Sequence, residues 1–134
     1  MLTQALLIGA IAGGLAVAGG AFGAHGLKAV LTPELLQTFE TAVRYQLYHA
    51  LALVALGILG RSAPTRAFEW AARGFTTGMA LFCGSLYVLA LSGVRWLGAI
   101  TPLGGVAFVV GWTCFAYGAY RLAKEDRGAT PSGR

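Results

Sequence analysis

The sequence is poor in charge. Only 11% of its 134 residues are Asp, Glu, Lys or Arg, whereas 57% are hydrophobic. A soluble domain carries charge on about a quarter of its residues, and a fold with so few charged side chains could not cover its own surface in water. Lipid removes that requirement, because side chains that face acyl chains should be apolar. The chain is long enough for one domain, so the composition predicts a single integral membrane domain.

Cysteine and histidine are scarce as well. The two cysteines, Cys83 and Cys114, lie inside apolar runs, where a thiol packs as a small hydrophobic group. No His or Cys spacing is typical of a metal site, so we predict neither a metal nor a cofactor. The net charge is +5, but the basic residues stand singly between apolar runs. This pattern argues against nucleic-acid binding.

Four segments are long enough to cross a bilayer. A hydrocarbon core of about 30 Å takes about 20 helical residues, and the expected spans are residues 2–24, 41–60, 74–94 and 97–120. The second span gains length from an amphipathic helix start over residues 33–44, where Thr32 is the cap and Pro33 stands in the first turn. The first run lacks the basic start of a signal peptide, so we expect it to remain as a span.

We therefore predict an all-α, membrane-spanning four-helix bundle over residues 1–124 and a disordered cytoplasmic tail over residues 125–134. The positive-inside rule predicts its orientation. Seven of the ten basic residues fall on one side of the predicted membrane and three on the other. The seven are Arg61, Arg66, Arg73, Arg121, Lys124, Arg127 and Arg134, and the three are Lys28, Arg44 and Arg95. Both termini should accordingly face the cytoplasm.

Small residues recur at steps of seven in three of the spans. Such stripes let helix backbones approach closely in a membrane, and a period of seven keeps one seam facing a neighbour in a left-handed bundle. We expect these residues, with the neighbouring glycines of the first span, to pack helix against helix. They are Gly9, Gly13, Gly20, Gly23, Gly78, Ser85, Gly104, Gly111 and Gly118.

The second helix carries most of the polar side chains expected within the membrane. Glu40, Arg44, Tyr45, Tyr48 and His49 fall within half of its circumference at about 100° per residue. One interpretation is local, because Glu40 and Arg44 have the i,i+4 order that favours an ion pair. The other is a ligand site, because polar groups inside a span are expensive and suggest function.

Polar or irregular features of the other spans are expected at the same outer level. His25 ends the first span, and Pro102 with its neighbouring glycines should break the fourth span, either as a packing kink or where it lines a cavity. Two histidines without a clear third ligand support a metal or haem weakly, and a hydrogen-bonded structural role is the alternative for each. We predict an outer polar pocket composed of His25, Glu40, Arg44, Tyr45, Gln46, Tyr48, His49, Ser92, Thr101 and Pro102.

Four separated motifs resemble the YgdD-type family of small membrane proteins. They are Gly20–Gly26 (GAFGAHG), Tyr45–His49 (YQLYH), Leu81–Tyr87 (LFCGSLY) and Thr101–Gly105 (TPLGG), the last followed by Gly111-Trp112. The resemblance covers about residues 5–120 in order. It implies four helices in an energy-transducing membrane, here the bacterial cytoplasmic (inner) membrane. The family has bacterial members and mitochondrial counterparts and is a domain of unknown function, so the resemblance supplies no reaction or substrate.

The sequence favours a non-enzymatic membrane protein that acts as a binding or accessory component. It has no nucleophile–base arrangement, phosphate loop or metal cluster. The expected partners are membrane lipids, an apolar or quinone-like ligand, and a larger membrane complex or a homo-oligomer. The alternative is a small transporter, channel or membrane enzyme that uses His25, Arg44 and His49, which intramembrane polar groups and a broken helix would favour.

Overall fold

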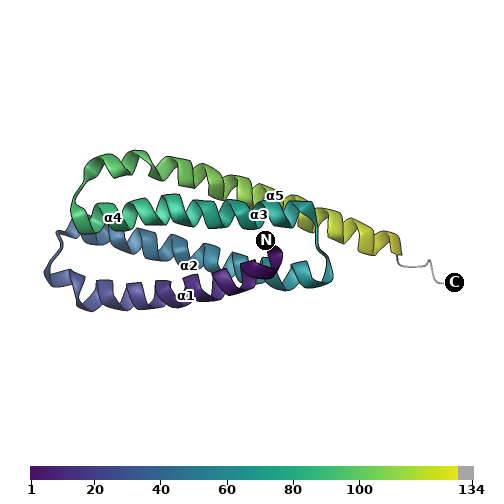
Figure 1. The fold of residues 1–134 in the computed structure, drawn as a ribbon, viewed down its shortest axis with the longest axis horizontal. Coiled ribbons are helices and arrows are strands. Elements are labelled where there is room, and N and C mark those ends of the chain that lie inside the picture. Colours follow the sequence, from purple (N-terminus) through teal and green to yellow (C-terminus); the bar gives the residue numbers. More distant parts are fainter. Residues whose placement is uncertain (130–134) are drawn as a thin grey trace.

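Four long helical segments lie side by side along the molecule in the computed structural model, which describes residues 1–129 (Figure 1). All four are long and apolar enough to cross a membrane, so the predicted four-span, all-helical architecture is confirmed. In chain order the elements are α1 (Leu2–His25), η1 (Leu27–Ala29), α2 (Pro33–Ser62), α3 (Arg66–Gly78), η2 (Met79–Cys83), α4 (Gly84–Ser92), η3 (Arg95–Ala99) and α5 (Thr101–Ala129).

The third span is a composite of α3, the π-helical turn η2 and α4. A π turn inserts extra chain into one helical turn and shifts the direction of the side chains that follow. The short 3-10 helices η1 and η3 lie in the two connections at one end of the bundle, which we call the Pro33 end. The N-terminus and the last part of α5 lie at the other, the Arg66 end, where α5 runs on past its neighbours (Figure 1).

The helix starts follow from capping chemistry. Thr32 precedes Pro33 and its hydroxyl oxygen accepts from the Leu35 amide at 3.4 Å, as the sequence predicts. Thr65 caps α3 in the same way, with 3.1 Å to the Phe68 amide. The third span therefore begins at Arg66, eight residues before the predicted start at residue 74, because a capped amphipathic turn extends the apolar run.

Two predictions about the fourth span are wrong. Pro102 does not kink the helix, because it stands in the first turn of α5, where the missing amide hydrogen is not needed. Residues 125–129 are helical rather than disordered. An i,i+4 ion pair between Arg121 and Glu125, at 3.6 Å, supports this last stretch. The rest of the predicted disordered tail, residues 130–134, lies outside the described residues.

Glycines bring the helices together in two tight pairs. Along α1 and α2, a Cβ placed on Gly9 would lie 2.6 Å from the Ala50 carbonyl oxygen, and one on Gly23 would lie 3.1 Å from the Phe39 ring. Gly13 and Gly20 face Ala50 and Val43 of α2 at ordinary contact distance. The α1 and α2 backbones therefore touch along most of their length.

Close contacts at small residues also join the third span to α5. Added Cβ atoms on Gly111 and Gly118 would lie 2.7 Å and 2.6 Å from the rings of Phe75 and Phe68. Gly78 faces Phe108, and Gly104 faces the backbone of Phe82. Ser85, the one hydroxyl residue of the predicted stripes, is buried and bonds to α5 through Thr101. Each predicted packing residue thus lies against a neighbouring helix.

Candidate functional site: the aromatic pocket between α2 and α5

His49 is the buried polar side chain at the centre of the molecule. It lies near the middle of α2 and is 4% exposed. Its imidazole stacks on the Phe108 ring of α5, with ring centroids 3.5 Å apart and planes 8° from parallel. The Phe75 ring of α3 lies 5.4 Å away on a tilted plane. The imidazole of α2 therefore contacts two other helices, α3 and α5.

Both ring nitrogens of His49 have partners. Nδ1 lies 2.7 Å from the Tyr45 carbonyl oxygen, which can only accept, so Nδ1 carries the proton. Nε2 accepts from the Trp112 indole N–H at 3.2 Å, because that group can only donate. The neutral ring in this tautomer satisfies both contacts and leaves no ring nitrogen free for a metal or haem iron. The structural interpretation of this histidine, left open by the sequence, fits the geometry better.

Aromatic rings surround this histidine on the side toward α5. Tyr45 stacks on Phe82 of the π turn with centroids 4.6 Å apart, and Phe82 lies 5.5 Å from Phe108. Trp112 packs edge-on to Phe75 at 5.0 Å. Helices α2 and α5 thus contact each other chiefly through side chains, whereas each of their backbones packs closely against another helix.

A cavity of about 600 Å³ lies in this space. We call it the aromatic pocket and define it by its lining: Tyr45, Tyr48, His49, Phe82, Gly105, Phe108, Val109 and Trp112. It opens on the outside of the bundle between α2 and α5, where Tyr48 and Trp112 are about half exposed. In a membrane this opening faces lipid. A Cβ on Gly105 would first meet Phe82 at 4.0 Å, so the pocket has room beside that glycine.

Few polar atoms reach the aromatic pocket. The Tyr45 and Tyr48 hydroxyls make no hydrogen bond within residues 1–129, and both side chains are exposed. The His49 nitrogens are already engaged. The pocket therefore offers ring faces to an apolar molecule and two phenol groups to a polar one, which is the usual character of a small-molecule site.

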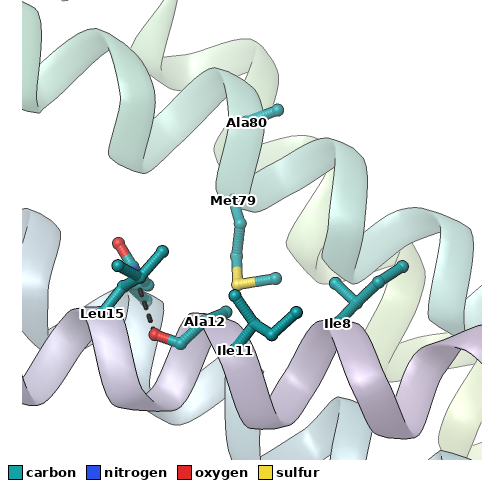
Figure 2. Close-up of a pocket in the computed structure, with 7 residues that line it drawn as sticks. Ile8, Ile11, Ala12, Leu15, Met79 and Ala80 are labelled. Carbon is teal, nitrogen blue, oxygen red and sulfur yellow. Dashed lines mark hydrogen bonds between the residues drawn. The ribbon is translucent and has the colours of Figure 1, made fainter.

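A second, smaller cavity of about 350 Å³ lies between α1, α2 and the π turn. Figure 2 shows the Met79 side chain reaching from the π turn toward Ile11 of α1. Its one polar side chain, Gln46, donates from Nε2 to the Ala12 carbonyl oxygen at 2.8 Å. Gln46 therefore joins α2 to α1, and its amide nitrogen is already engaged in that bond.

The structure does not bring the predicted outer polar pocket together. Gly23 lies against Phe39 and Gly13 against Ala50, so His25 and His49 are about 12 residues apart in level, or about 18 Å along the helix axes. His25 is exposed and makes no hydrogen bond or ion pair within residues 1–129. The prediction that these two histidines meet is wrong, because the α1–α2 glycine contacts set a different register.

The other predicted members are divided between local contacts and the pocket. Ser92 is exposed and hydrogen-bonds to the backbone around its own helix end. Thr101 pairs with Ser85 at 2.8 Å, and Pro102 is exposed at the start of α5. Glu40 is exposed and forms no ion pair with any residue of the described range 1–129. Only Tyr45, Tyr48 and His49 of the predicted set line the aromatic pocket.

The α5 half and the π-turn wall of the pocket were not predicted from the sequence. Phe82, Phe108 and Trp112 look like ordinary apolar residues of a span, and Gly105 like a flexible neighbour of Pro102. One signal was available: an indole N–H inside a span needs a hydrogen-bond acceptor. Within the spans the candidates include His49, which is 63 residues away in sequence.

Fold and site together define a class: a small integral membrane protein with four helical spans and a lipid-facing aromatic pocket. A family model described as a protein of unknown function (DUF423) matches residues 19–105. A UPF0382 membrane protein of Staphylococcus saprophyticus is 42% identical over 87% of this chain and 97% of its own length. The UPF0382 membrane protein YwdK of Bacillus subtilis is 41% identical over 87% of this chain and 95% of its own.

The UPF0382 inner membrane protein YgdD of Escherichia coli is 38% identical over 90% of this chain and 92% of its own length. The chain belongs to this UPF0382/DUF423 family of membrane proteins, and the resemblance carried by its four motifs is confirmed. It is an integral inner-membrane protein. No solved structure matches the chain.

Proposed function

We propose that the protein is a non-enzymatic binding protein of the inner membrane that holds an amphipathic membrane molecule in the aromatic pocket. The observation that carries the proposal is the cavity itself, about 600 Å³ in volume and lined by rings from α2, the π turn and α5. This volume is in the range of small-molecule sites. The molecule would enter sideways from the lipid, because the pocket opens between two membrane helices.

The chemistry of the lining supports a ligand with a flat or flexible apolar body. Ring faces of Phe82, Phe108 and Trp112 favour stacking and apolar contact. The free hydroxyls of Tyr45 and Tyr48 supply hydrogen bonds for a polar head. A quinone-like ring or a lipid chain meets both requirements. The smaller α1–α2 cavity has less support as a site, because its single polar side chain already bonds to the Ala12 carbonyl.

Binding has more support than catalysis, transport or conduction. The alternative function needs His25, Arg44 and His49 to act as one polar group, and His25 lies about 18 Å from the level of His49. A proton relay through His49 would first have to break its bonds to Tyr45 and Trp112. A larger membrane complex and a homo-oligomer remain predicted partners.

The test is to fill the pocket without disturbing the fold. Gly105→Leu would place an isobutyl group inside the cavity, because a Cβ there has room. The matched control is Gly84→Leu in α4, where an added Cβ meets no atom within 4 Å. Wild-type protein and the control should carry the same small molecule through purification in mild detergent, detected by native mass spectrometry.

The Gly105→Leu variant should lose that molecule while keeping the thermal stability of the control. Equal retention by all three proteins, or no retained molecule in any of them, would refute the proposal.

A further inference from the structure

We propose that Arg44 makes the aromatic pocket selective for an anionic amphiphile, whose phosphate or carboxylate head pairs with the guanidinium while its apolar body lies among the rings. This inference rests on the proposed function and names the class of ligand. It also accounts for a cation that has no counter-ion in the part of the chain that the structure describes.

Arg44 has no acidic partner among residues 1–129. Its one hydrogen bond runs from Nη2 to the Thr41 hydroxyl oxygen at 3.4 Å, and the side chain is exposed. Glu40 stands four residues earlier, yet it forms no ion pair with Arg44. The ion pairs of Arg73 with Glu69 and of Arg121 with Glu125 lie at the Arg66 end. Most of the guanidinium donors of Arg44 are therefore unused.

An arginine without an acidic partner is unusual at the depth of Arg44 in the membrane. Gly20 of α1 lies against Val43, the residue before Arg44. The uncharged run of α1 continues to Ala24, so the Arg44 backbone lies about 7.5 Å inside the end of that run. Side chains on a helix lean toward its N-terminus, and the bond to Thr41 follows that direction. The guanidinium thus extends toward the level where lipid head groups meet the apolar core.

The α2 side of the aromatic pocket is formed by residues that follow Arg44 along the helix. Tyr45 and Tyr48 are one and four residues after Arg44 on α2, and both line the pocket. Their rings lie 6.1 Å apart. Residues four apart share a helix face, so Arg44 and Tyr48 form one stripe that descends from the head-group level into the cavity. An amphiphile that enters sideways and lies along the membrane normal would place its head beside the charge and its apolar body among the rings.

The guanidinium suits an oxyanion better than any other head. Its planar donors match the two oxygens of a carboxylate or phosphate, and charge-assisted bonds of this kind are about twice as strong as neutral ones. A zwitterionic or neutral amphiphile would fill the same apolar space without this gain. All amphiphiles with the same acyl chain should therefore share one affinity for the apolar part of the pocket, and an anionic head should add to it.

The experiment is a native mass spectrometry titration of delipidated protein in a neutral detergent. Four probes distinguish anionic from uncharged or zwitterionic heads, and a carboxylate head from a phospholipid head. They are a long-chain fatty acid, its methyl ester, a phosphatidylglycerol and a phosphatidylcholine with the same chains. We compare wild type with Arg44→Gln and Arg44→Lys. The matched control is Arg61→Gln, at the opposite end of α2, where Arg61 is exposed and makes no hydrogen bond or ion pair within residues 1–129.

Arg44→Gln should weaken binding of the preferred anion about 10-fold, while the neutral counterpart binds as before. Arg44→Lys should keep part of the preference, and Arg61→Gln all of it. A preference for the fatty acid over its ester identifies a carboxylate source, and one for phosphatidylglycerol over phosphatidylcholine identifies a phospholipid source.

Saturable binding that Gly105→Leu abolishes, but that shows no preference for anions in wild type, would refute the role of Arg44 and leave the pocket intact. An equal loss in the Arg44→Gln and Arg61→Gln variants would also refute it. Absence of saturable binding for every probe would instead refute the proposed function on which the inference rests.

Discussion

His49 shows how a single polar residue can be stabilised inside a membrane helix. Its two ring nitrogens bond to a carbonyl of its own helix and to the indole of Trp112 on α5. Its ring face lies on Phe108. Because α2 and α5 share few backbone contacts, these side chains are the principal connection between the two helices across the pocket. His49 therefore both shapes the pocket wall and holds it in place.

Replacing His49 with Ala should destabilise the protein by about 2–4 kcal/mol, because the change leaves a cavity and removes the hydrogen-bond acceptor of the Trp112 indole N–H. The measurement is unfolding in mixed micelles, followed by circular dichroism. Leu51→Ala on the same helix is the control, since Leu51 is 61% exposed and should have little effect. Equal losses in the two variants would mean that His49 is not a packing centre.

At the scale of elements, the glycines determine which helices pair. Gly74 lies against the Gly111 backbone, and Gly57 lies against Leu6. The spacing Gly74-x-x-x-Gly78, which could serve self-association, is thus used within the chain. The small-residue contacts join α1 to α2 and the third span to α5. Helix α2 also packs against the third span, and the aromatic pocket forms where α2 faces α5 through larger side chains.

Gly111→Leu should reduce the free energy of unfolding by about 3 kcal/mol, because its Cβ alone would lie 2.7 Å from the fully buried Phe75 ring. Gly14→Leu is the matched control in α1, where an added Cβ meets nothing within 4 Å. Thermal unfolding in one detergent compares them. If Gly111→Leu melts at the temperature of the control, the close contact between the third span and α5 is not formed.

For the whole molecule, charge predicts how the bundle is inserted. Within residues 1–129, the Arg66 end carries most of the Lys and Arg side chains, and the N-terminus and the last described turns of α5 lie at that end (Figure 1). We expect this end to face the cytoplasm. A phosphatase fused after Arg134 should be inactive, and a fluorescent protein fused at the same place should fold. An active phosphatase fusion would reverse the orientation.

Most of the fold could be predicted from the sequence, since hydropathy and capping residues act locally. The sequence itself marks the start of the first span at Leu2, the start of the second helix at Pro33, and the packing face of the fourth span by its stripe of Gly104, Gly111 and Gly118. The π turn could not be predicted, because the sequence of Met79–Cys83 has the pattern of a regular apolar α-helix. Pro102 was placed inside a span rather than at a helix start, because the apolar run continues on both sides of it.

The site was predictable only in its α2 half. Tyr45, Tyr48 and His49 are visible as polar groups in an apolar run, whereas Phe108 and Trp112 join them only through the packing of α5 beside the third span. Whether His25 meets His49 depends on the sliding register of α1 against α2. That register is set by contacts such as Gly9 with Ala50, and the level of a residue within its own span does not reveal it.

The binding of a membrane amphiphile in the aromatic pocket is tested most directly by the fluorescence of Trp112, which lines it. With Trp70 and Trp96 replaced by Phe, Trp112 is the only tryptophan left. Titration with a fatty acid brominated at mid-chain should quench its emission saturably. Saturation should persist in Gly84→Leu and disappear in Gly105→Leu. Quenching that rises without saturation, and equally in all three proteins, would contradict the pocket.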